Sequence, residues 1–388
     1  MAPDKRMKLK PGTCVANRWT IKKKLGSGAF GAVYLCTGQH GEEAALKTEA
    51  VTTSRRFLKM EANIMRSLAN LQDADGKKHF CRCLDLGHDE QPDKKTNVQT
   101  KFNYIVMSLV GRGLDRLVPK ATGRFSPGTA IGVSIQMLDA IKALHKIGWV
   151  HRDIKPDNCA LGRTKDHEKG LLYLIDFGMA NHLLINGYHR PERTTVAFRG
   201  TLQYAPASTH MERDYGRKDD VESWFYVLIE LYRGSLPWDT LKRSRQIGEA
   251  KCRRVKKDVP EHIRKQAAAD LLDGCPKDFA KILKHIDGLQ FYDEPDYPMM
   301  ISTLRNHLTA NGIQEHPYDW ERASGSVGQP SSSGDEGETS AWDVGDRSKD
   351  KGKAKESTWE LKRSVAGSES DEASPHGAAT DEEYASMY

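Results

Sequence analysis

The sequence predicts an α+β protein with two lobes: a β-rich amino-terminal lobe that carries one main helix, and a mostly helical carboxy-terminal lobe. Two patterns support this fold class. Up to about residue 110, apolar and polar residues mostly alternate in short segments, as they do in half-buried strands. Beyond that point, apolar residues recur mainly at helical spacing over longer segments.

The amino-terminal part contains several strand patterns and one helix pattern. Residues 19–35 alternate and then break at glycines, as two strands joined by a turn would, and residues 44–47 indicate another strand. Residues 54–71 place apolar side chains at helical spacing, whereas residues 104–109 form a short run typical of a buried strand. Residues 88–101 are polar, which predicts a loop between two strands.

Helix patterns dominate the second part of the chain. We expect helices over residues 114–117, 127–147 and 220–232, the last of which is apolar enough to be buried. Two later helices are expected over residues 261–272 and 277–286. The expected strands end by residue 109 and the expected helices begin soon after it. We therefore place the boundary between the lobes near residues 109 and 110.

One large folded domain is expected between two flanking segments. The chain of 388 residues is long enough to bury a core without disulfide bonds. After residue 322, serine, glycine and charged residues dominate, and such a segment buries too little apolar surface to offset its ordering entropy. We therefore expect an amino-terminal extension, a domain with lobes at 17–109 and 110–312, a linker and a disordered acidic tail: residues 1–16, 17–312, 313–322 and 323–388.

The formal net charge of +6 is unevenly spread along the chain. Residues 323–388 hold 14 acidic and 7 basic side chains, so this tail carries −7 and residues 1–322 carry +13. A basic body attracts nucleic acid, anionic lipid, or acidic and phosphorylated protein. Charge alone does not choose among these partners.

Seven scattered cysteines and the lack of an apolar leader indicate reduced thiols in a cytosolic protein. Cys81 and Cys83 have no matching second pair, which argues against a zinc site. No apolar run reaches the ~18 residues that a membrane span requires. We expect a cytoplasmic monomer without membrane or nucleic-acid partners, and nuclear entry stays open.

A glycine-rich segment, Gly26-Ser27-Gly28-Ala29-Phe30-Gly31, is the first of four motifs that carry chemistry. Glycines let the backbone approach phosphate oxygens and offer N–H donors to them. A lone motif of this kind also occurs in dinucleotide-binding folds, where a helix follows the glycines. Here residues 32–35 continue as a strand, so the motif predicts a phosphate-covering loop between two strands.

Lys47 ends the apolar segment Ala44-Ala45-Leu46-Lys47, sixteen residues after the last glycine of that loop. On its own it would be an ordinary surface lysine. A lysine that holds phosphates needs an anionic partner to aim it. Glu61 lies 14 residues later on the expected helix, and it is a better candidate than Glu43 or Glu49, which lie off that helix.

The strongest signal is His151-Arg152-Asp153-Ile154-Lys155-Pro156-Asp157-Asn158, which matches the pattern H-R-D-x-x-x-x-N. In this pattern Asp153 would orient the attacking hydroxyl and accept its proton, and Asn158 would bind a metal ion. Lys155, two residues after the aspartate, would balance charge on the transferred phosphoryl group. We expect Asp157 to be structural.

The fourth motif, Asp176-Phe177-Gly178, follows the apolar segment 171–175. Magnesium prefers a few carboxylate or carbonyl oxygens together with phosphates and waters, so Asp176 would bind Mg²⁺ beside the phosphates. The triplet alone occurs by chance in many proteins. The four motifs together, in this order and spacing, predict phosphoryl transfer from ATP with Mg²⁺.

With these motifs, the chain resembles protein kinases of the casein kinase one superfamily, and within it the tau-tubulin kinase-like branch. The resemblance covers about residues 17–312. Beyond the general motifs it rests on five segments: Phe57-Leu58-Lys59-Met60-Glu61, Phe102-Asn103-Tyr104-Ile105-Val106-Met107, Phe198-Arg199-Gly200-Thr201, Lys218-Asp219-Asp220-Val221-Glu222-Ser223 and Gly234-Ser235-Leu236-Pro237-Trp238.

The resemblance implies the bilobal protein kinase fold with ATP in the cleft between the lobes. Met107 would be the gatekeeper, residues 108–110 the hinge that hydrogen-bonds adenine, and Asp220 a support below the catalytic loop. The expected catalytic residues are Asp153, Lys155, Lys47 and Glu61, and the expected metal ligands are Asn158 and Asp176. The expected nucleotide contacts are Leu25, Gly26, Gly28, Gly31, Val33, Lys47, Met107, Ser108 and Leu109.

Two positions depart from the usual kinase pattern. Ala205-Pro206-Ala207-Ser208 lacks the glutamate of the common A-P-E triplet, as does the superfamily, which is typically active without phosphorylation of the activation loop. At Gln203 the family usually has an arginine that binds a phosphate already present on the substrate, and a neutral amide here replaces a bidentate donor. Nearby bases either compensate or are ordinary surface residues: Arg199, Arg217, Lys218, Lys242 and Arg243.

Three functions fit different features of this sequence. An active serine/threonine protein kinase, acting on acidic or phosphoprimed protein substrates, is favoured because every catalytic position is filled. A pseudokinase scaffold, which would bind partners without phosphoryl transfer, is supported only by the untypical Gln203. A nucleic-acid-binding protein would account for the basic body, but no recognition helix, finger or aromatic RNA motif supports it.

Overall fold

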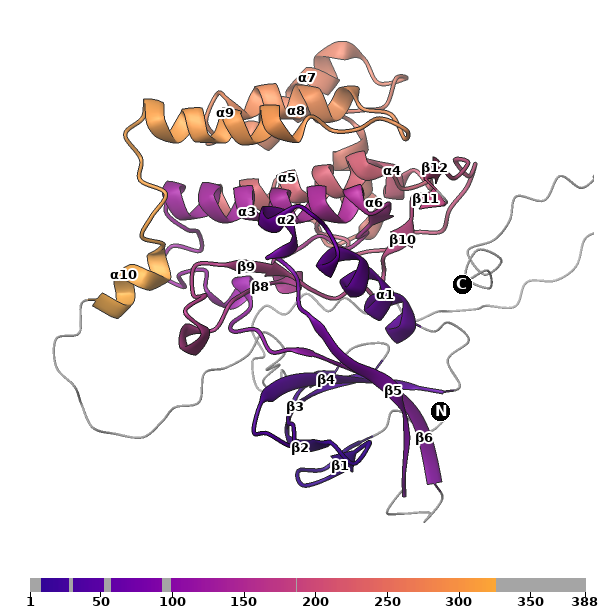
Figure 1. The fold of residues 1–388 in the computed structure, drawn as a ribbon. Helices are drawn as coiled ribbons and strands as arrows, with labels where there is room; N and C mark the ends of the chain where they lie inside the picture. Colours follow the sequence, from indigo (N-terminus) through magenta and orange to yellow (C-terminus); the bar gives the residue numbers. More distant parts are fainter. Residues whose placement is uncertain (1–7, 28–30, 52–56, 93–98, 186, 326–388) are drawn as a thin grey trace, which may run out of the picture.

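The computed structural model describes residues 8–27, 31–51, 57–92, 99–185 and 187–325. Within these residues, a β-rich amino-terminal lobe lies below a lobe built mainly of helices (Figure 1). The predicted α+β fold class with two lobes is therefore confirmed. The expected tail lies almost entirely outside the described residues.

The amino-terminal lobe is one antiparallel sheet with the strand order β1-β2-β3-β4-β6-β5. Ala44 and Leu46 of β4 enter one apolar cluster, whereas Ala45 enters the other, as the alternation of side chains along a strand requires. Lys47 therefore faces the same side as Ala45, with Val33 and Ile105 beside it on the neighbouring strands. The strands are Cys14–Val15 (β1), Trp19–Ser27 (β2), Ala32–Thr37 (β3), Glu43–Ala50 (β4), Cys83–Pro92 (β5) and Gln99–Ser108 (β6).

The prediction of a loop over residues 88–101 was wrong for most of that segment. Strand β5 continues to Pro92 and β6 begins at Gln99, with His88 opposite Asn103 and Glu90 opposite Lys101. At this end of the hairpin the side chains are largely exposed, so strand pairing does not require an apolar face. The polar composition reflects exposure of the two strands rather than absence of a strand.

Helix α1 (Phe57–Ala69) packs against this sheet, and a short helix, α2 (Ala74–Lys77), follows it. Leu58, Ala62, Met65 and Leu68 lie on the buried face of α1. Glu61 shares that face, because it is three residues from Leu58 and four from Met65. The apolar spacing of the helix thus directs Glu61 toward the sheet.

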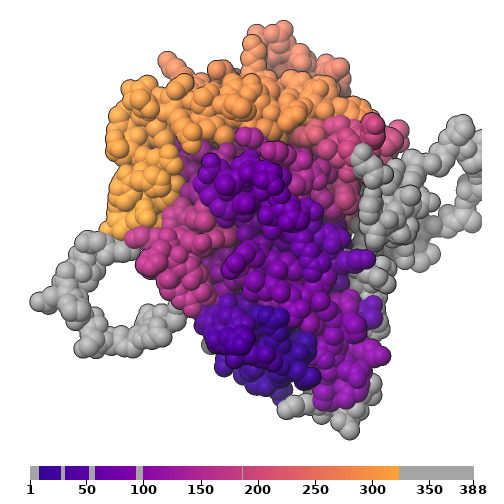
Figure 2. Space-filling view, in the orientation of Figure 1, coloured from indigo at the N-terminus to yellow at the C-terminus, as the bar shows by residue number. Residues whose placement is uncertain are grey.

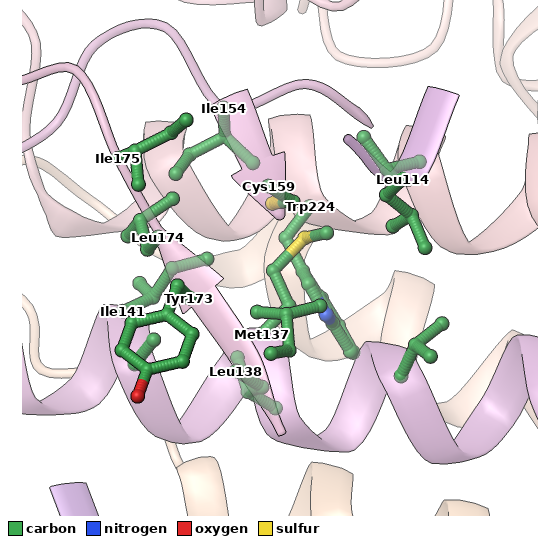
Figure 3. Packing of buried hydrophobic residues seen from close by; sticks show 14 of the residues in the cluster. Leu114, Met137, Leu138, Ile141, Ile154, Cys159, Tyr173, Leu174, Ile175 and Trp224 are labelled. Atoms are coloured by element: carbon green, nitrogen blue, oxygen red, sulfur yellow. The ribbon is translucent and has the colours of Figure 1, made fainter. Parts of the chain in front are cut away.

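The carboxy-terminal lobe is centred on two long helices, α3 (Pro127–Lys146) and α5 (Arg217–Arg233). Ser126 caps α3, with Pro127 at its first turn, and the indole N–H of Trp224 on α5 donates to the carbonyl of Ser134 on α3 at 2.8 Å. Figure 3 shows Trp224 packed with Met137 and neighbouring apolar side chains between these helices and the short strands. The predicted helices over 127–147, 220–232, 261–272 and 277–286 are confirmed, with ends shifted by no more than three residues.

The remaining elements of this lobe are short strands and further helices. The strands are Trp149–Val150 (β7), Cys159–Leu161 (β8), Leu172–Leu174 (β9), Asn181–His182 (β10), Leu184–Ile185 (β11) and Tyr188–His189 (β12). The helices are Ala207–His210 (α4), Ser244–Cys252 (α6), Glu261–Leu272 (α7), Phe279–Gly288 (α8), Tyr297–Ala310 (α9) and Asp319–Gly325 (α10). Three 3-10 turns span Leu114–Arg116 (η1), Pro156–Asn158 (η2) and Thr164–Asp166 (η3).

The segment expected as a linker, residues 313–322, packs against the start of α3. Tyr318 is fully buried, and its hydroxyl lies 2.9 Å from the amide nitrogen of Gln136. The carboxylate of Asp319 accepts hydrogen bonds from Ser126 N at 2.7 Å and from Ser126 Oγ at 2.6 Å. Figure 2 shows this orange segment covering the flank of the helical lobe. It is held as part of the folded structure.

Replacing Asp319 with alanine should remove both hydrogen bonds to Ser126 and destabilise the fold by about 1–3 kcal/mol, because the acceptor is charged. Urea unfolding measures the loss. A double-mutant cycle with Ser126→Ala should give a coupling of about 0.5–3 kcal/mol. Strictly additive effects would contradict a direct interaction.

Candidate active site

Three charged side chains from different elements meet between the lobes. Lys47 Nζ on β4 lies 2.5 Å from Glu61 Oε1 on α1 and 3.0 Å from Asp176 Oδ1, which follows β9. The side chains of Lys47 and Glu61 are 13% and 3% exposed, whereas that of Asp176 is 48% exposed. The ion pair of Lys47 with Glu61 is thus shielded from water, and Asp176 presents its carboxylate to the open side.

The neighbouring charges set the ionisation of this group. Burial opposes the charge on Lys47, but the carboxylates of Asp176 and Glu61 outweigh it and raise the lysine pKa. Burial raises the pKa of Glu61 to about 7, although Lys47 opposes this shift. For Asp176, loss of hydration is outweighed by Lys47 and by the Gly178 N–H, which lower the pKa to about 2. Asp176 is therefore an anion at neutral pH.

A second group of polar side chains surrounds Asp153. Lys155 Nζ lies 2.8 Å from Asp153 Oδ2, and Asn158 Nδ2 donates to the same oxygen at 3.0 Å. The hydroxyl of Thr201 donates to Asp153 Oδ1 at 2.6 Å and accepts from Lys155 Nζ at 2.9 Å. Burial opposes the charge on Lys155, but Asp153 raises its pKa, so Lys155 stays a cation.

Thr201 had no role among the predicted site residues, although it belongs to the segment Phe198–Arg199–Gly200–Thr201. It is 48 positions from Asp153 in sequence, so no local pattern joins the two. Only the fold shows that its hydroxyl links Asp153 and Lys155. The signal available in the sequence was the resemblance of that segment to the kinase family.

The catalytic loop is fixed from below by Asp220 on α5. Asp220 Oδ2 accepts from His151 N at 2.7 Å, and Asp220 Oδ1 accepts from Arg152 N at 2.9 Å. Arg152 and Asp176 have positive φ angles of 71° and 65°, which non-glycine residues rarely adopt. The two loops that carry Asp153 and Asp176 are therefore held in unusual backbone conformations.

Several of the expected nucleotide contacts belong to the apolar core that the sheet shares with the helical lobe. Leu25, Val33 and Met107 belong to one apolar cluster, and Leu109 packs against it. Gly31 has no room for a side chain, because a Cβ there would collide with the carbonyl of Thr48. The remaining contacts are placed by strand pairing, with Gly26 opposite Val33 and Ser108 opposite Ala44. Gly28 lies outside the described residues.

The two expected metal ligands have the donor types that Mg²⁺ prefers. Asp176 offers an exposed, ionised carboxylate. The amide nitrogen of Asn158 donates to Asp153, which leaves its oxygen as the atom suited to a cation. Across the described ranges of the chain, no group of three or more His, Cys, Asp or Glu side chains could hold a metal ion. A magnesium ion does not need such a group, since phosphates and waters complete its coordination.

The segment after the activation loop is anchored without the glutamate of an A-P-E triplet. Glu222 on α5 accepts from Ala207 N at 3.2 Å and pairs with Arg254 Nη2 at 2.7 Å. Arg254 also pairs with Asp287. Glu222 thus supplies, from a helix, the carboxylate that the triplet lacks.

Gln203 is held by an acidic residue. Its amide nitrogen donates to Asp239 Oδ1, while Asp239 Oδ2 accepts from Leu236 N at 2.9 Å. Two of the bases considered as compensating residues have partners as well. Arg217 contacts His189 Nε2 at 2.9 Å, and Lys218 Nζ donates to Ser208 Oγ and to Asp219. In these contacts, Arg217 and Lys218 are bound to residues other than Gln203.

The family model for the protein kinase domain matches residues 19–286. A curated relative from Dictyostelium discoideum, named as a probable serine/threonine-protein kinase, is 35% identical over 316 residues, which are 80% of this chain and 58% of the relative. The chain therefore belongs to the protein kinase domain family, and its fold is the bilobal kinase fold. It spans somewhat more than half the length of the curated relative. No helix in the described part of the chain is long and apolar enough to cross a membrane.

The buried Glu61 should make stability depend on pH in a recognisable way. Glutamate in the unfolded chain ionises near pH 4.5, whereas Glu61 in the fold has a pKa of about 7. Between these values the folded state binds the extra proton, so this group's contribution to stability falls as pH rises. Glu61→Gln cannot titrate, and its stability relative to wild type should increase from pH 5 to pH 8. Thermal unfolding of both proteins tests this, and parallel pH curves would contradict it.

Proposed function

We propose that this chain is an active serine/threonine protein kinase that transfers the γ-phosphoryl group of ATP to hydroxyl groups of proteins. The observation that carries the proposal is the presence of two polar groups built from the residues of the four motifs. Lys47 is within ion-pair distance of both Glu61 and Asp176. Asp153 is joined to both Lys155 and Thr201. Family membership and the name of the curated relative support the same conclusion.

In this proposal, Lys47 holds the α- and β-phosphates and Glu61 fixes its position. Asp176 and Asn158 bind Mg²⁺, which neutralises charge on the phosphates when it is bound. Asp153 orients the substrate hydroxyl and accepts its proton, while Lys155 balances the charge on the phosphoryl group in transfer. The transition state is highly anionic, so positioning and electrostatic stabilisation supply most of the rate enhancement.

Thr201 contacts the two residues that would act on the substrate hydroxyl, Asp153 and Lys155. Its hydroxyl lies between Asp153 and Lys155 and hydrogen-bonds to both. A hydroxyl bound in this position is similar in chemistry to the serine or threonine hydroxyl that the proposal assigns to Asp153. We infer that Thr201 keeps Asp153 and Lys155 aligned before the substrate arrives.

A pseudokinase scaffold is the second candidate function. Its support is the neutral Gln203 at a position where the family usually has an arginine. The intact ion pair of Lys47 with Glu61 argues against it, because a scaffold has no need to shield that pair from water. Cytoplasmic location and a monomeric state stay predictions from the sequence.

Asp153→Asn should lower phosphoryl transfer by about 10²–10⁴-fold, the usual contribution of a positioned acid–base group. ATP binding should be unchanged, because Asp153 contacts Lys155, Asn158 and Thr201 and is not given a role in holding the phosphates. Radiolabel transfer from γ-labelled ATP to protein and peptide substrates, beside nucleotide titration, measures both. Wild-type turnover in the variant would refute the role of Asp153. ATP binding without transfer by wild type would favour the scaffold.

Preference for acidic or phosphoprimed substrates is a finer prediction that comes from the family resemblance. The contacts of Gln203 argue against a phosphate at this position, because its amide is bound to Asp239 and a second anion would be repelled. The basic body still allows acidic residues to bind elsewhere on the surface.

We therefore expect wild type to phosphorylate a phosphoprimed peptide no faster than the peptide of the same sequence that lacks the priming phosphate. The double variant Gln203→Arg with Asp239→Asn supplies a cation and removes the competing carboxylate. It should favour the primed peptide by about tenfold or more, given the strength of charge-assisted hydrogen bonds. Competition between the two peptides measures the ratio, and a strong wild-type preference for the primed peptide would overturn this reading.

A further inference from the structure

A buried cation lies behind the segment that follows Thr201. Lys251 on α6 is only 1% exposed and is among the largest fully buried side chains of the described residues. Lysine is almost never fully buried unless it is paired. None of the roles proposed above uses Lys251, so its burial needs a separate explanation.

The ammonium group of Lys251 is bound by three main-chain carbonyls of one short segment. Nζ donates to Leu202 O at 2.9 Å, to Gln203 O at 2.9 Å and to Ala205 O at 2.7 Å. A charged ammonium has three N–H donors, and three acceptors satisfy all of them. The match between donors and acceptors explains how a lysine is tolerated at this depth.

Two aromatic rings add to this binding site. Nζ of Lys251 lies 5.0 Å from the ring centre of Tyr226 and 4.7 Å from that of Trp238, within the range of cation–π contacts. The indole N–H of Trp238 also donates to Gln203 O at 3.0 Å. Burial lowers the pKa of Lys251 to about 7, while Glu222 opposes this shift. The three carbonyls and two rings favour the charged form.

The segment bound by Lys251 is the same turn that carries Thr201. The N–H groups of Tyr204 and Ala205 both donate to Thr201 O, at 2.9 and 2.8 Å. Residues 201–205 therefore form one closed turn, with the Thr201 hydroxyl against Asp153 at its start. A shift of the carbonyls at Lys251 would move that hydroxyl as well.

We propose that Lys251 is a positioning residue, which fixes the turn 201–205 so that Thr201 stays against Asp153 and the turn is presented in one shape to the protein substrate. The inference rests on the proposed function and deepens it, because it names what orders the substrate side of the site. Lys251 acts through main-chain atoms and does not touch the reacting groups.

The test compares Lys251→Met with a control on the same helix. Methionine keeps the length of the side chain but removes its charge and its N–H donors. Ile247 is 3% exposed on α6 and belongs to the apolar core, so Ile247→Ala reports what general loosening of α6 does. Both variants are assayed per folded molecule, with stability measured by thermal unfolding.

We expect Lys251→Met to lower kcat by about 10²-fold, the effect of a displacement near 1 Å at a reacting site. The KM for a peptide substrate should rise, whereas the Kd for ATP should stay at the wild-type value. Ile247→Ala should lower the melting temperature and leave these constants unchanged. If Lys251→Met does not fold, Lys251→Gln, which keeps two N–H donors, serves the same comparison.

Hydrogen exchange of the amides of Tyr204 and Ala205 gives a readout that does not depend on activity. Exchange should accelerate in the Lys251 variant and not in Ile247→Ala. Wild-type kinetic constants in the folded Lys251 variant, or unchanged exchange of these amides, would overturn the inference. If wild type transfers no phosphoryl group, the proposed function fails instead, and the exchange measurement still decides whether Lys251 fixes the turn.

Discussion

The geometry of the candidate site depends on one buried carboxylate. Asp220 is fully buried on α5 and accepts main-chain hydrogen bonds from His151 and Arg152. A carboxylate without donors at this depth would be very costly, so Asp220 and the catalytic loop are stable only together. Arg152 reaches the carboxylate through a backbone with φ of 71°. The position of Asp153, one residue further on, therefore follows from a hydrogen-bonded charge inside the helical core.

The same carboxylate links the catalytic loop to the helices around it. His145 Nε2 on α3 lies 2.8 Å from Asp220 Oδ2, and the hydroxyl of Tyr215 donates to Oδ1 at 2.8 Å. Burial opposes ionisation, but the hydrogen bonds from His145 and His151 N lower the pKa of Asp220. The Asp220 carboxylate accepts hydrogen bonds from four groups: His151 N, Arg152 N, His145 Nε2 and the Tyr215 hydroxyl. It joins α3, α5 and the catalytic loop at one point.

Motifs and periodicity predicted those parts of the fold and site that local sequence determines. The spacing of Lys47 from the glycine-rich motif, together with the helical spacing around Glu61, was enough to predict that Lys47 and Glu61 form a pair. The hairpin at 88–101 was missed because one of its faces is exposed and the other is half-buried by polar residues (Asp89, Gln91 and Thr100), which removes the apolar signal of a strand. Thr201 and Lys251 could not be found in the same way, since their contacts join segments more than 40 residues apart.

Net charge was a poor guide to the electrostatics of the activation segment, because basic residues there meet buried acids. Arg190 and Arg193 both bind the carboxylate of Asp214, which lies at 0% side-chain exposure. Loss of hydration opposes the charge on Asp214, but the two guanidinium groups outweigh it and lower its pKa. One carboxylate balances one of these two guanidinium charges, so the second positive charge stays uncompensated by Asp214. The net charge of +13 already includes Asp214, but it does not show that these two arginines are bound to a buried carboxylate.

The turn 201–205 and the residues after it are held by groups that belong to the core. Thr201 is tied to Asp153, the carbonyls at 202, 203 and 205 to Lys251, and Ala207 N to Glu222. Among the described residues, none of these ties involves the glutamate of an A-P-E triplet. Each anchor is a charged side chain that binds a main-chain or hydroxyl group of this segment, and Asp153 and Glu222 are also paired with Lys155 and Arg254. The conformation of this segment therefore follows from contacts with three other parts of the fold: Asp153 of the catalytic loop, Lys251 of α6 and Glu222 of α5.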